Sequence, residues 1–191
     1  MIVTVTLNPS IDRTASLPGP LQRGQVNRLG NSTEVSAGKG VNISRVLCGA
    51  GVDTCAVVPA GTKDRLVTGL ANDKIPHIAV PISTPARTNL TITEPDGTTT
   101  KINHPGAALT TAELTAVEEI ILETSTDAEW VVLSGSLPPG VPSDWYTTMT
   151  RRLHETGVKV AVDTSDKPLQ ELSGKLPESA PELVKPNSVE L

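Results

Sequence analysis

Short apolar runs rich in Val, Ile and Leu alternate with segments of helical periodicity along most of this chain. Such runs, without regular polar alternation, are typical of strands that are buried on both faces of a parallel sheet. The alternation therefore predicts an α/β fold, with a parallel sheet flanked by helices. The predicted strands are 2–7, 54–58, 130–134, 159–163 and 182–185, and the predicted helices are 39–50, 63–72, 111–124, 143–156 and 167–173.

Two segments interrupt this alternation. Residues 12–35 contain Thr-, Val- and Gly-rich pieces without a helical period, and residues 86–103 are typical of a hairpin that turns at Pro95, Asp96 and Gly97. Strands inserted at two separate points could pair as one small β-layer beside the main sheet, where they would serve as a lid over a ligand cleft or as a dimer surface. The alternative is a pair of unrelated surface hairpins.

Charge and cysteine usage narrow the classes of partner. The net charge of −5 argues against a dedicated nucleic-acid surface, so an anionic ligand would have to be bound by a few well-placed cations. Cys48 and Cys55 lack the spacing of metal ligands and are expected to be reduced thiols in a cytoplasmic protein. The N-terminal residues have neither a basic flank nor a long apolar run, so no signal peptide or membrane span is predicted.

The stretch "SAGKGVN", residues 36–42, places two glycines around a lysine where a predicted helix begins. It is not a nucleotide-binding P-loop, because Thr33 occupies the place of the first glycine and Gly40 follows Lys39 where that loop needs Ser or Thr. Gly38 and Gly40 could still let the backbone approach a ligand, and the free N–H groups of a helix start favour an anion. The alternative is a plain strand-to-helix turn with a solvated lysine.

Polar residues follow several predicted strands, and ligands of open α/β sheets bind beyond the carboxyl ends of the strands. These residues are Asn8, Asp12, Ser134, Gly135, Ser136, Asp163, Thr164, Lys185 and Asn187. Asp12 could accept two hydrogen bonds from vicinal hydroxyls, or it could form an Asx turn around Pro9.

Two further positions suit an anionic group. The prolines of "SGSLPPGVP", residues 134–142, stiffen a loop in which Ser136 could be held against a ligand oxygen, although a tight crossover turn is the alternative. Arg87 opens the predicted hairpin and could bind phosphate in a bidentate manner, or it could be a solvated arginine on an edge strand.

Taken together, these pieces resemble the phosphofructokinase B branch of the ribokinase-like sugar kinases. The resemblance rests on an ordered series along the whole chain: "TLNPSID" (6–12), "AGKGVNISRVL" (37–47), "RTN" (87–89), "SGSLPPGVP" and "VKPNSVEL" (184–191). The lysine of the glycine turn and the phrase "TEPDGTTTKINHPG" are most similar to the 1-phosphofructokinases. The resemblance implies one ribokinase-like domain over residues 1–191, with residues 12–35 and 86–103 forming a discontinuous β lid.

The resemblance also implies roles for individual residues. Asp12, Gly38 and Asn42 would hold the sugar hydroxyls, and Asn89 would also contact the substrate. Lys39, Arg87 and Ser136 would lie near the phosphate that the sugar already has. Lys185, Asn187 and Glu190 would belong to the ATP and Mg²⁺ side, where the glutamate would act through metal-bound water.

The implied activity is ATP-dependent phosphorylation of a ketohexose phosphate. The favoured reaction is the conversion of fructose 1-phosphate to fructose 1,6-bisphosphate. Tagatose 6-phosphate or fructose 6-phosphate as the acceptor, or a non-catalytic sugar-phosphate-binding fragment, are the alternatives. The family's catalytic Gly-Ala-Gly-Asp motif does not occur in this sequence, so the catalytic base and the C-terminal part of the fold are expected beyond residue 191 and the chain alone is expected to be inactive. A full-length protein is expected to form a homodimer through the lid, without nucleic-acid or membrane partners.

Overall fold

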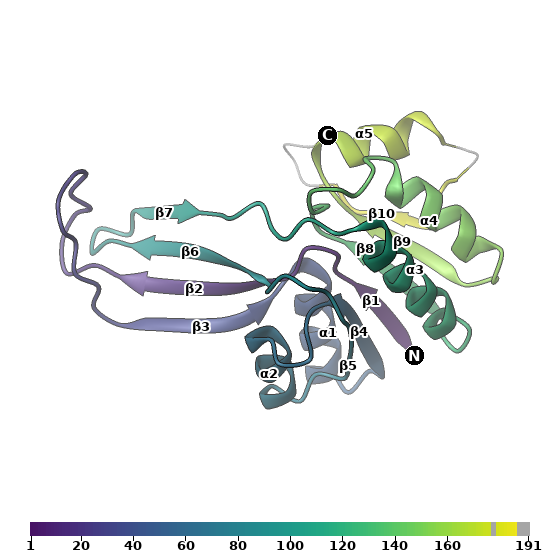
Figure 1. Ribbon diagram of the computed structural model, residues 1–191, viewed down its shortest axis with the longest axis horizontal. Helices are drawn as coiled ribbons and strands as arrows, with labels where there is room; N and C mark the ends of the chain where they lie inside the picture. Colours follow the sequence, from purple (N-terminus) through teal and green to yellow (C-terminus); the bar gives the residue numbers. More distant parts are fainter. Residues whose placement is uncertain (177–178, 187–191) are drawn as a thin grey trace.

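The computed structural model, which describes residues 1–176 and 179–186, has a main sheet of six strands in the order β10-β9-β8-β1-β4-β5 (Figure 1). All neighbouring strands of this sheet pair in parallel, which confirms the predicted α/β fold. The strands are β1 (Ile2–Val5), β4 (Thr54–Pro59), β5 (His77–Val80), β8 (Trp130–Ser134), β9 (Lys159–Asp163) and β10 (Leu183–Val184).

Helices cover both faces of the main sheet. Alternate side chains of a strand point to opposite faces, and the alternate residues of β4 accordingly belong to different cores. Val57 packs in one cluster with Val117 and Ile121 of α3, whereas Ala56 and Val58 pack in another with residues of α1 and α2. The helices are α1 (Lys39–Gly49), α2 (Arg65–Asn72), α3 (Thr111–Ser125), α4 (Trp145–His154) and α5 (Asp166–Gly174). None of the helices in the described ranges has the length and apolar character needed to cross a bilayer.

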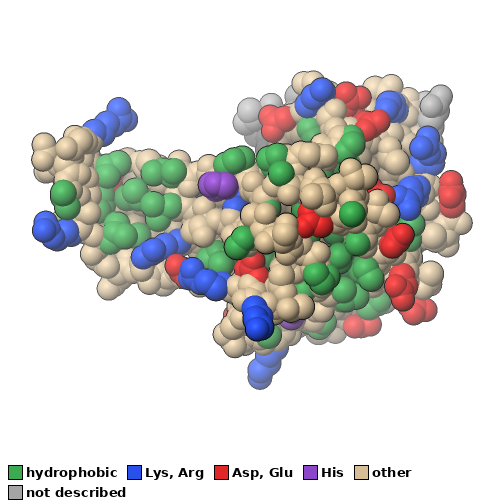
Figure 2. Space-filling view, in the orientation of Figure 1, with side chains coloured by type: hydrophobic (Ala, Val, Ile, Leu, Met, Phe, Trp, Pro, Cys, Tyr) green, Lys and Arg blue, Asp and Glu red, His purple; other side chains and the backbone are tan. Residues whose placement is uncertain are grey.

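The two inserted segments pair into one four-stranded sheet, which we call the small sheet and which extends from the main domain as a long blade (Figure 1). Its order is β3-β2-β6-β7, and its central pair, β2 and β6, is parallel. Its strands are β2 (Ser10–Ser16), β3 (Ser32–Ala37), β6 (Arg87–Thr93) and β7 (Thr99–Ile102). Apolar side chains gather over this blade (Figure 2). The segments are therefore not two unrelated hairpins, while a lid function stays a prediction.

Strand β5 is the element that the sequence analysis does not predict. Its four residues, "HIAV", lie between Pro76 and Pro81 and pair only with β4 at the edge of the main sheet. So short a run gives little periodic signal. It becomes a strand because the edge of β4 offers it backbone hydrogen bonds.

A capping box fixes the start of α3 and ties it to the loop that leads into β6. The carboxylate of Glu113 accepts hydrogen bonds from the Thr110 N–H at 2.8 Å and from the Ser83 N–H at 2.8 Å, and Thr110 Oγ1 accepts from the Glu113 N–H at 3.2 Å. These backbone donors favour the ionised form and lower the pKa of Glu113 to about 2.

We expect Glu113→Gln to lower the free energy of unfolding at neutral pH, by an amount that depends on pH. The folded-state pKa of about 2 lies below the ordinary value of 4.5, so the contribution of the carboxylate is fully present above pH 4.5 and is lost as the pH falls toward 2. Urea unfolding at a series of pH values measures this. The difference between variant and parent should shrink below pH 4.5, whereas Glu119→Gln, an exposed position on the same helix, should have little effect at any pH. A difference that does not change with pH would contradict this role of the charge.

Candidate functional site

Two glycines let the first turn of α1 pack closely on the carboxyl end of β1. A Cβ added to Gly38, whose φ is 138°, would lie 2.6 Å from Thr6 Cγ2, and one added to Gly40 would lie 2.6 Å from Thr6 Oγ1 and 2.9 Å from the Val5 carbonyl oxygen. The Val41 N–H donates to Thr6 Oγ1 at 3.2 Å. The close approach that these glycines permit is therefore to β1, and a contact of Gly38 with a ligand stays a prediction.

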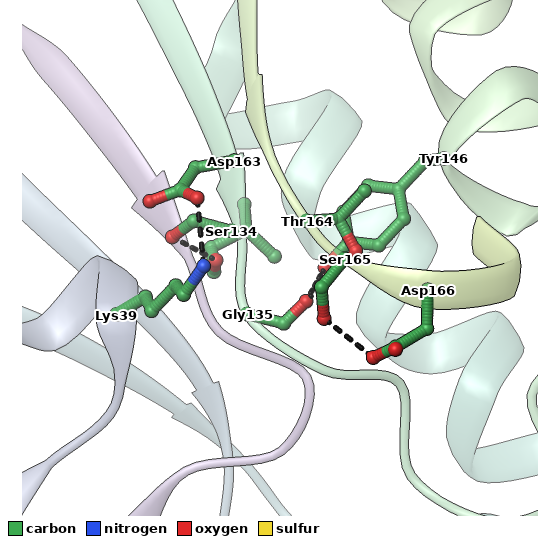
Figure 3. A network of polar contacts seen from close by, with 9 residues as sticks. Lys39, Ser134, Gly135, Tyr146, Asp163, Thr164, Ser165 and Asp166 are labelled. Atoms are coloured by element: carbon green, nitrogen blue, oxygen red, sulfur yellow. Dashed lines mark hydrogen bonds and ion pairs between the residues drawn. The ribbon is translucent and has the colours of Figure 1, made fainter. Parts of the chain in front are cut away.

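Lys39 joins the start of α1 to the end of β9. Its Nζ lies 2.7 Å from Asp163 Oδ1, and the two side chains point toward each other across the carboxyl edge of the sheet (Figure 3). The Asp163 side chain is only 14% exposed, against 44% for Lys39. In this structure the ammonium group of Lys39 thus has a carboxylate partner, and its predicted place beside a sugar phosphate stays a prediction.

The turn that precedes Ser136 is held by buried donors. Tyr146 Oη and Thr164 Oγ1 both donate to the Gly135 carbonyl oxygen, at 2.8 and 3.1 Å, and the Gly135 N–H donates to the Asp163 carbonyl oxygen at 2.9 Å (Figure 3). Burial raises the pKa of Tyr146, so its phenol stays protonated and remains a donor. This network fixes the backbone from which Ser136 projects.

Asn8 connects this turn to the loop that follows β7. Its Nδ2 donates to Ser136 Oγ at 3.1 Å and to the Pro105 carbonyl oxygen at 3.0 Å. Gly106, with φ of 106°, lies so close that an added Cβ would be 2.1 Å from Asn8 Oδ1. Because Ser136 Oγ accepts the bond from Asn8, its own O–H is available to donate to a ligand.

Arg87, the first residue of β6, is anchored by backbone carbonyl groups. Its Nη1 donates to the His104 carbonyl oxygen at 2.8 Å and its Nη2 to the Asn8 carbonyl oxygen at 3.1 Å. Its Nε is buried and has no hydrogen-bond partner in the described part of the chain. Burial lowers the pKa of Arg87, and the nearby Asp12 acts in the opposite direction. A guanidinium has five N–H donors, so the two anchoring bonds leave donors for a ligand.

Arg87 and Ser136, which the sequence analysis assigns to one phosphate, line the same pocket. Its volume is about 600 Å³, and none of the described residues that line it is Asp or Glu. Its walls are Asn8, Arg87, Asn103, His104, Pro105, Ser136, Leu137, Pro138, Pro139, Gly140, Val141, Ser143 and Pro168. A single guanidinium with neutral donors around it and no carboxylate suits a small anion.

Asp12 and Asn89 lie side by side on the small sheet, two residues from Ser10 and Arg87 in the register of β2 and β6. Asp12 Oδ1 accepts from Ser10 Oγ at 2.7 Å and from Asn89 Nδ2 at 3.0 Å. Among the described residues no donor is bonded to Asp12 Oδ2, which can accept from hydroxyl groups. The Asp12 side chain is thus held by the Asn89 amide on the neighbouring strand and by Ser10, and it does not form the alternative Asx turn around Pro9.

Asn42 is exposed on the first turns of α1 and is held by Arg45. Arg45 Nη1 donates to Asn42 Oδ1 at 2.7 Å, and Nη2 donates to the Ser36 carbonyl oxygen at 2.5 Å and to Asp73 Oδ2 at 3.2 Å. One side chain therefore connects α1 with the end of β3 and with α2. The sequence analysis gives Arg45 no role, because these contacts involve residues up to 28 positions away.

Of the three residues predicted for the nucleotide side, the structure describes only Lys185. Lys185 follows β10, its N–H donates to the Val162 carbonyl oxygen at 3.0 Å, and its side chain is exposed. Asn187 and Glu190, the predicted ligand of metal-bound water, lie outside the described residues.

We expect Tyr146→Phe to destabilise the fold by about 1 kcal/mol, the typical net contribution of one hydrogen bond. Thr164→Val should have a similar effect, since each variant leaves the Gly135 carbonyl oxygen with one donor. The double variant should cost more than the sum of the two, because that buried oxygen then has neither side-chain donor. Denaturant unfolding of the four proteins measures this, and strictly additive values would contradict a shared acceptor.

Comparisons with a family model and with curated proteins both identify similarity to carbohydrate kinases of one family. The model of the pfkB family of carbohydrate kinases matches residues 5–191. The chain is 35% identical to the ATP-dependent 6-phosphofructokinase isozyme 2 of Escherichia coli (strain K12), over 100% of this chain and 61% of that protein. It is 34% identical to the 1-phosphofructokinase of Xanthomonas campestris pv. campestris, over 99% of this chain and 60% of that protein.

A solved structure shows the same likeness in three dimensions. The chain superimposes on the crystal structure of phosphofructokinase-2 from Escherichia coli in complex with fructose-6-phosphate with a TM-score of 0.88, at 33% identity, over 99% of this chain and 62% of that one. The chain thus spans about three fifths of the length of these relatives.

Proposed function

Because the chain belongs to the pfkB family of carbohydrate kinases, we propose that it provides the sugar-phosphate-binding part of an ATP-dependent ketohexose-phosphate kinase. The proposed acceptor is fructose 1-phosphate, which would be converted to fructose 1,6-bisphosphate. The observation that supports this most directly is the pocket in which Arg87 and Ser136 meet without any acidic neighbour on its described walls. An anion-binding pocket beside hydroxyl-binding groups is the combination that a phosphorylated sugar needs.

The arrangement suggests an orientation for the sugar phosphate. The phosphate group would lie in the pocket, between the free N–H groups of Arg87 and the O–H of Ser136. The sugar hydroxyls would lie toward Asp12 and Asn89, which follow Arg87 along the small sheet. Asp12 would accept hydrogen bonds from two hydroxyls, and the small sheet would act as a lid that excludes water from the transfer.

ATP and Mg²⁺ are proposed as co-substrate and cofactor. The exposed ammonium group of Lys185 at the carboxyl edge of the main sheet fits a polyphosphate. Asn187 and Glu190 are proposed for the same side. Mg²⁺ neutralises charge on the phosphates when it is bound.

Substitution of Arg87 tests the phosphate site directly. In calorimetric titrations with fructose 1-phosphate, we expect Arg87→Ala to weaken binding by about 1.5 to 3 kcal/mol, the range for hydrogen bonds to charged groups. Arg87→Lys should recover only part of this, because an ammonium group keeps the charge but not the bidentate geometry. Arg151→Ala removes an exposed arginine of α4 outside the pocket and should leave affinity unchanged.

Three results would weigh against the proposal. Equal affinity of parent and Arg87→Ala would remove Arg87 from the site. Equal affinity for fructose and fructose 1-phosphate would exclude a phosphate pocket. Tighter binding of fructose 6-phosphate or tagatose 6-phosphate would correct the acceptor while keeping the site.

In a coupled assay free of other kinases we expect the chain alone to produce no ADP, because the motif that supplies the family's catalytic base is absent from its sequence.

We also propose a homodimer through the small sheet. Four large apolar side chains of the two inserted segments are exposed, Val26 at 79%, Leu29 at 44%, Val35 at 44% and Ile102 at 56%. The register places Val35 level with Asp12 and Ile102 level with Leu90 and Arg13, so these two side chains lie on opposite faces of the small sheet, and the proposed contact is the face that carries Ile102. Exposed apolar side chains on sheets favour association. Apolar side chains gather over the blade, and Lys and Arg lie at its outer end (Figure 2).

We expect Ile102→Lys to weaken self-association, measured by sedimentation equilibrium over a range of protein concentrations. Val46→Lys provides the matched control, since Val46 is 70% exposed on α1, outside the small sheet. A parent chain that stays monomeric at every concentration, or a control variant that dissociates as readily, would overturn this interface.

A further inference from the structure

His104 is one of the residues that line the pocket described above, and one nitrogen of its ring accepts a hydrogen bond from the backbone. The Gly106 N–H lies 3.2 Å from His104 Nδ1. An amide N–H can only donate, so Nδ1 acts as an acceptor. In a neutral imidazole the proton then resides on Nε2, which makes Nε2 a donor.

The loop that holds this ring is itself held in place by Arg87 and Asn8. Arg87 Nη1 donates to the His104 carbonyl oxygen at 2.8 Å, and Asn8 Nδ2 donates to the Pro105 carbonyl oxygen at 3.0 Å. Gly106 packs against the side-chain amide of Asn8, with no room there for a Cβ. The side chain of His104 is exposed on the pocket wall, and Nε2 has no partner among the residues that the structure describes.

We propose that His104 is a further recognition residue for the phosphate group of the substrate, donating from Nε2–H to a phosphate oxygen. This rests on the proposed function. The pocket would then offer three separate donors, the guanidinium of Arg87, the hydroxyl of Ser136 and the imidazole of His104.

Three donors from three separate segments of the chain suit a phosphate monoester, which has three terminal oxygens, better than a carboxylate, which has two. In the neutral tautomer described above, the imidazole adds a directed donor without a formal charge, and so contributes to selectivity among anions as well as to affinity.

Nuclear magnetic resonance of the imidazole nitrogens tests the tautomer and the contact in one experiment. The chain has only three histidines, so His104→Gln identifies the signals of His104. We expect the free chain to show protonated Nε2 and unprotonated Nδ1 for the neutral ring. Addition of fructose 1-phosphate should shift Nε2–H, whereas fructose should leave it in place.

Three substitutions separate donation from mere packing. A Gln amide nitrogen can reach the position of Nε2, an Asn amide only that of Nδ1, and Leu donates nothing. We expect His104→Leu and His104→Asn to weaken fructose 1-phosphate binding about tenfold, the effect of one hydrogen bond to a charged group, and His104→Gln to retain most of the affinity. His154→Leu, on α4 and outside the pocket, is the matched control.

The outcomes distinguish this inference from the proposed function. If Arg87→Ala weakens binding but His104→Leu does not, or if Nδ1 proves to be the protonated nitrogen, His104 is not a phosphate donor and the proposed function stands. If His104→Gln loses as much affinity as His104→Leu, the ring acts through packing and the inference fails. If the parent chain binds fructose 1-phosphate no better than fructose, the proposed function and this inference fail together.

Discussion

The common direction of the six strands of the main sheet is the constraint on which the candidate site depends. Parallel strands bring all their carboxyl ends to one edge, and the loops that leave them must cross there. Lys39, Asp163 and the turn at Gly135 meet at this edge although they are far apart in the sequence (Figure 3). The close packing of α1 on β1 at Gly40 keeps the edge compact, since a Cβ at this position would lie 2.6 Å from Thr6 Oγ1.

Besides the Lys39–Asp163 ion pair at this edge, the walls of the pocket are held by hydrogen bonds between neutral groups and by bonds to backbone carbonyl oxygens. Asn8 contacts both the Ser136 hydroxyl and the loop at Pro105, while its own carbonyl oxygen accepts from Arg87. Tyr146 and Thr164 both donate to the carbonyl oxygen of Gly135, the residue before Ser136. Neutral donors and acceptors position the walls, so the charge of Arg87 is not neutralised by a carboxylate of the pocket lining and can attract an anion.

The small sheet provides residues of the candidate site as well as its own cross-strand contacts. Arg87 is both the first residue of β6 and a wall of the pocket, and Asp12 pairs with Asn89 across β2 and β6. A ligand bound between Arg87 and Asp12 would therefore contact the base of the blade and the main domain at once. Arg45 provides a second connection, because it links Asn42 to the Ser36 carbonyl group at the end of β3.

The sequence by itself determined most of the elements and their class, although not the edge strand β5, because periodicity and turn residues are local properties. The predicted strands 130–134 and 159–163 agree with β8 and β9, and the inserted segments at Asp12 and Arg87 do form strands. Only the tertiary structure decided which polar residues meet. It brought Arg87 and Ser136 into one pocket, paired Lys39 with Asp163 outside that pocket, and added Asn8 and His104 to its walls. These contacts join residues separated by up to 128 positions, and no local pattern in a sequence encodes such distances.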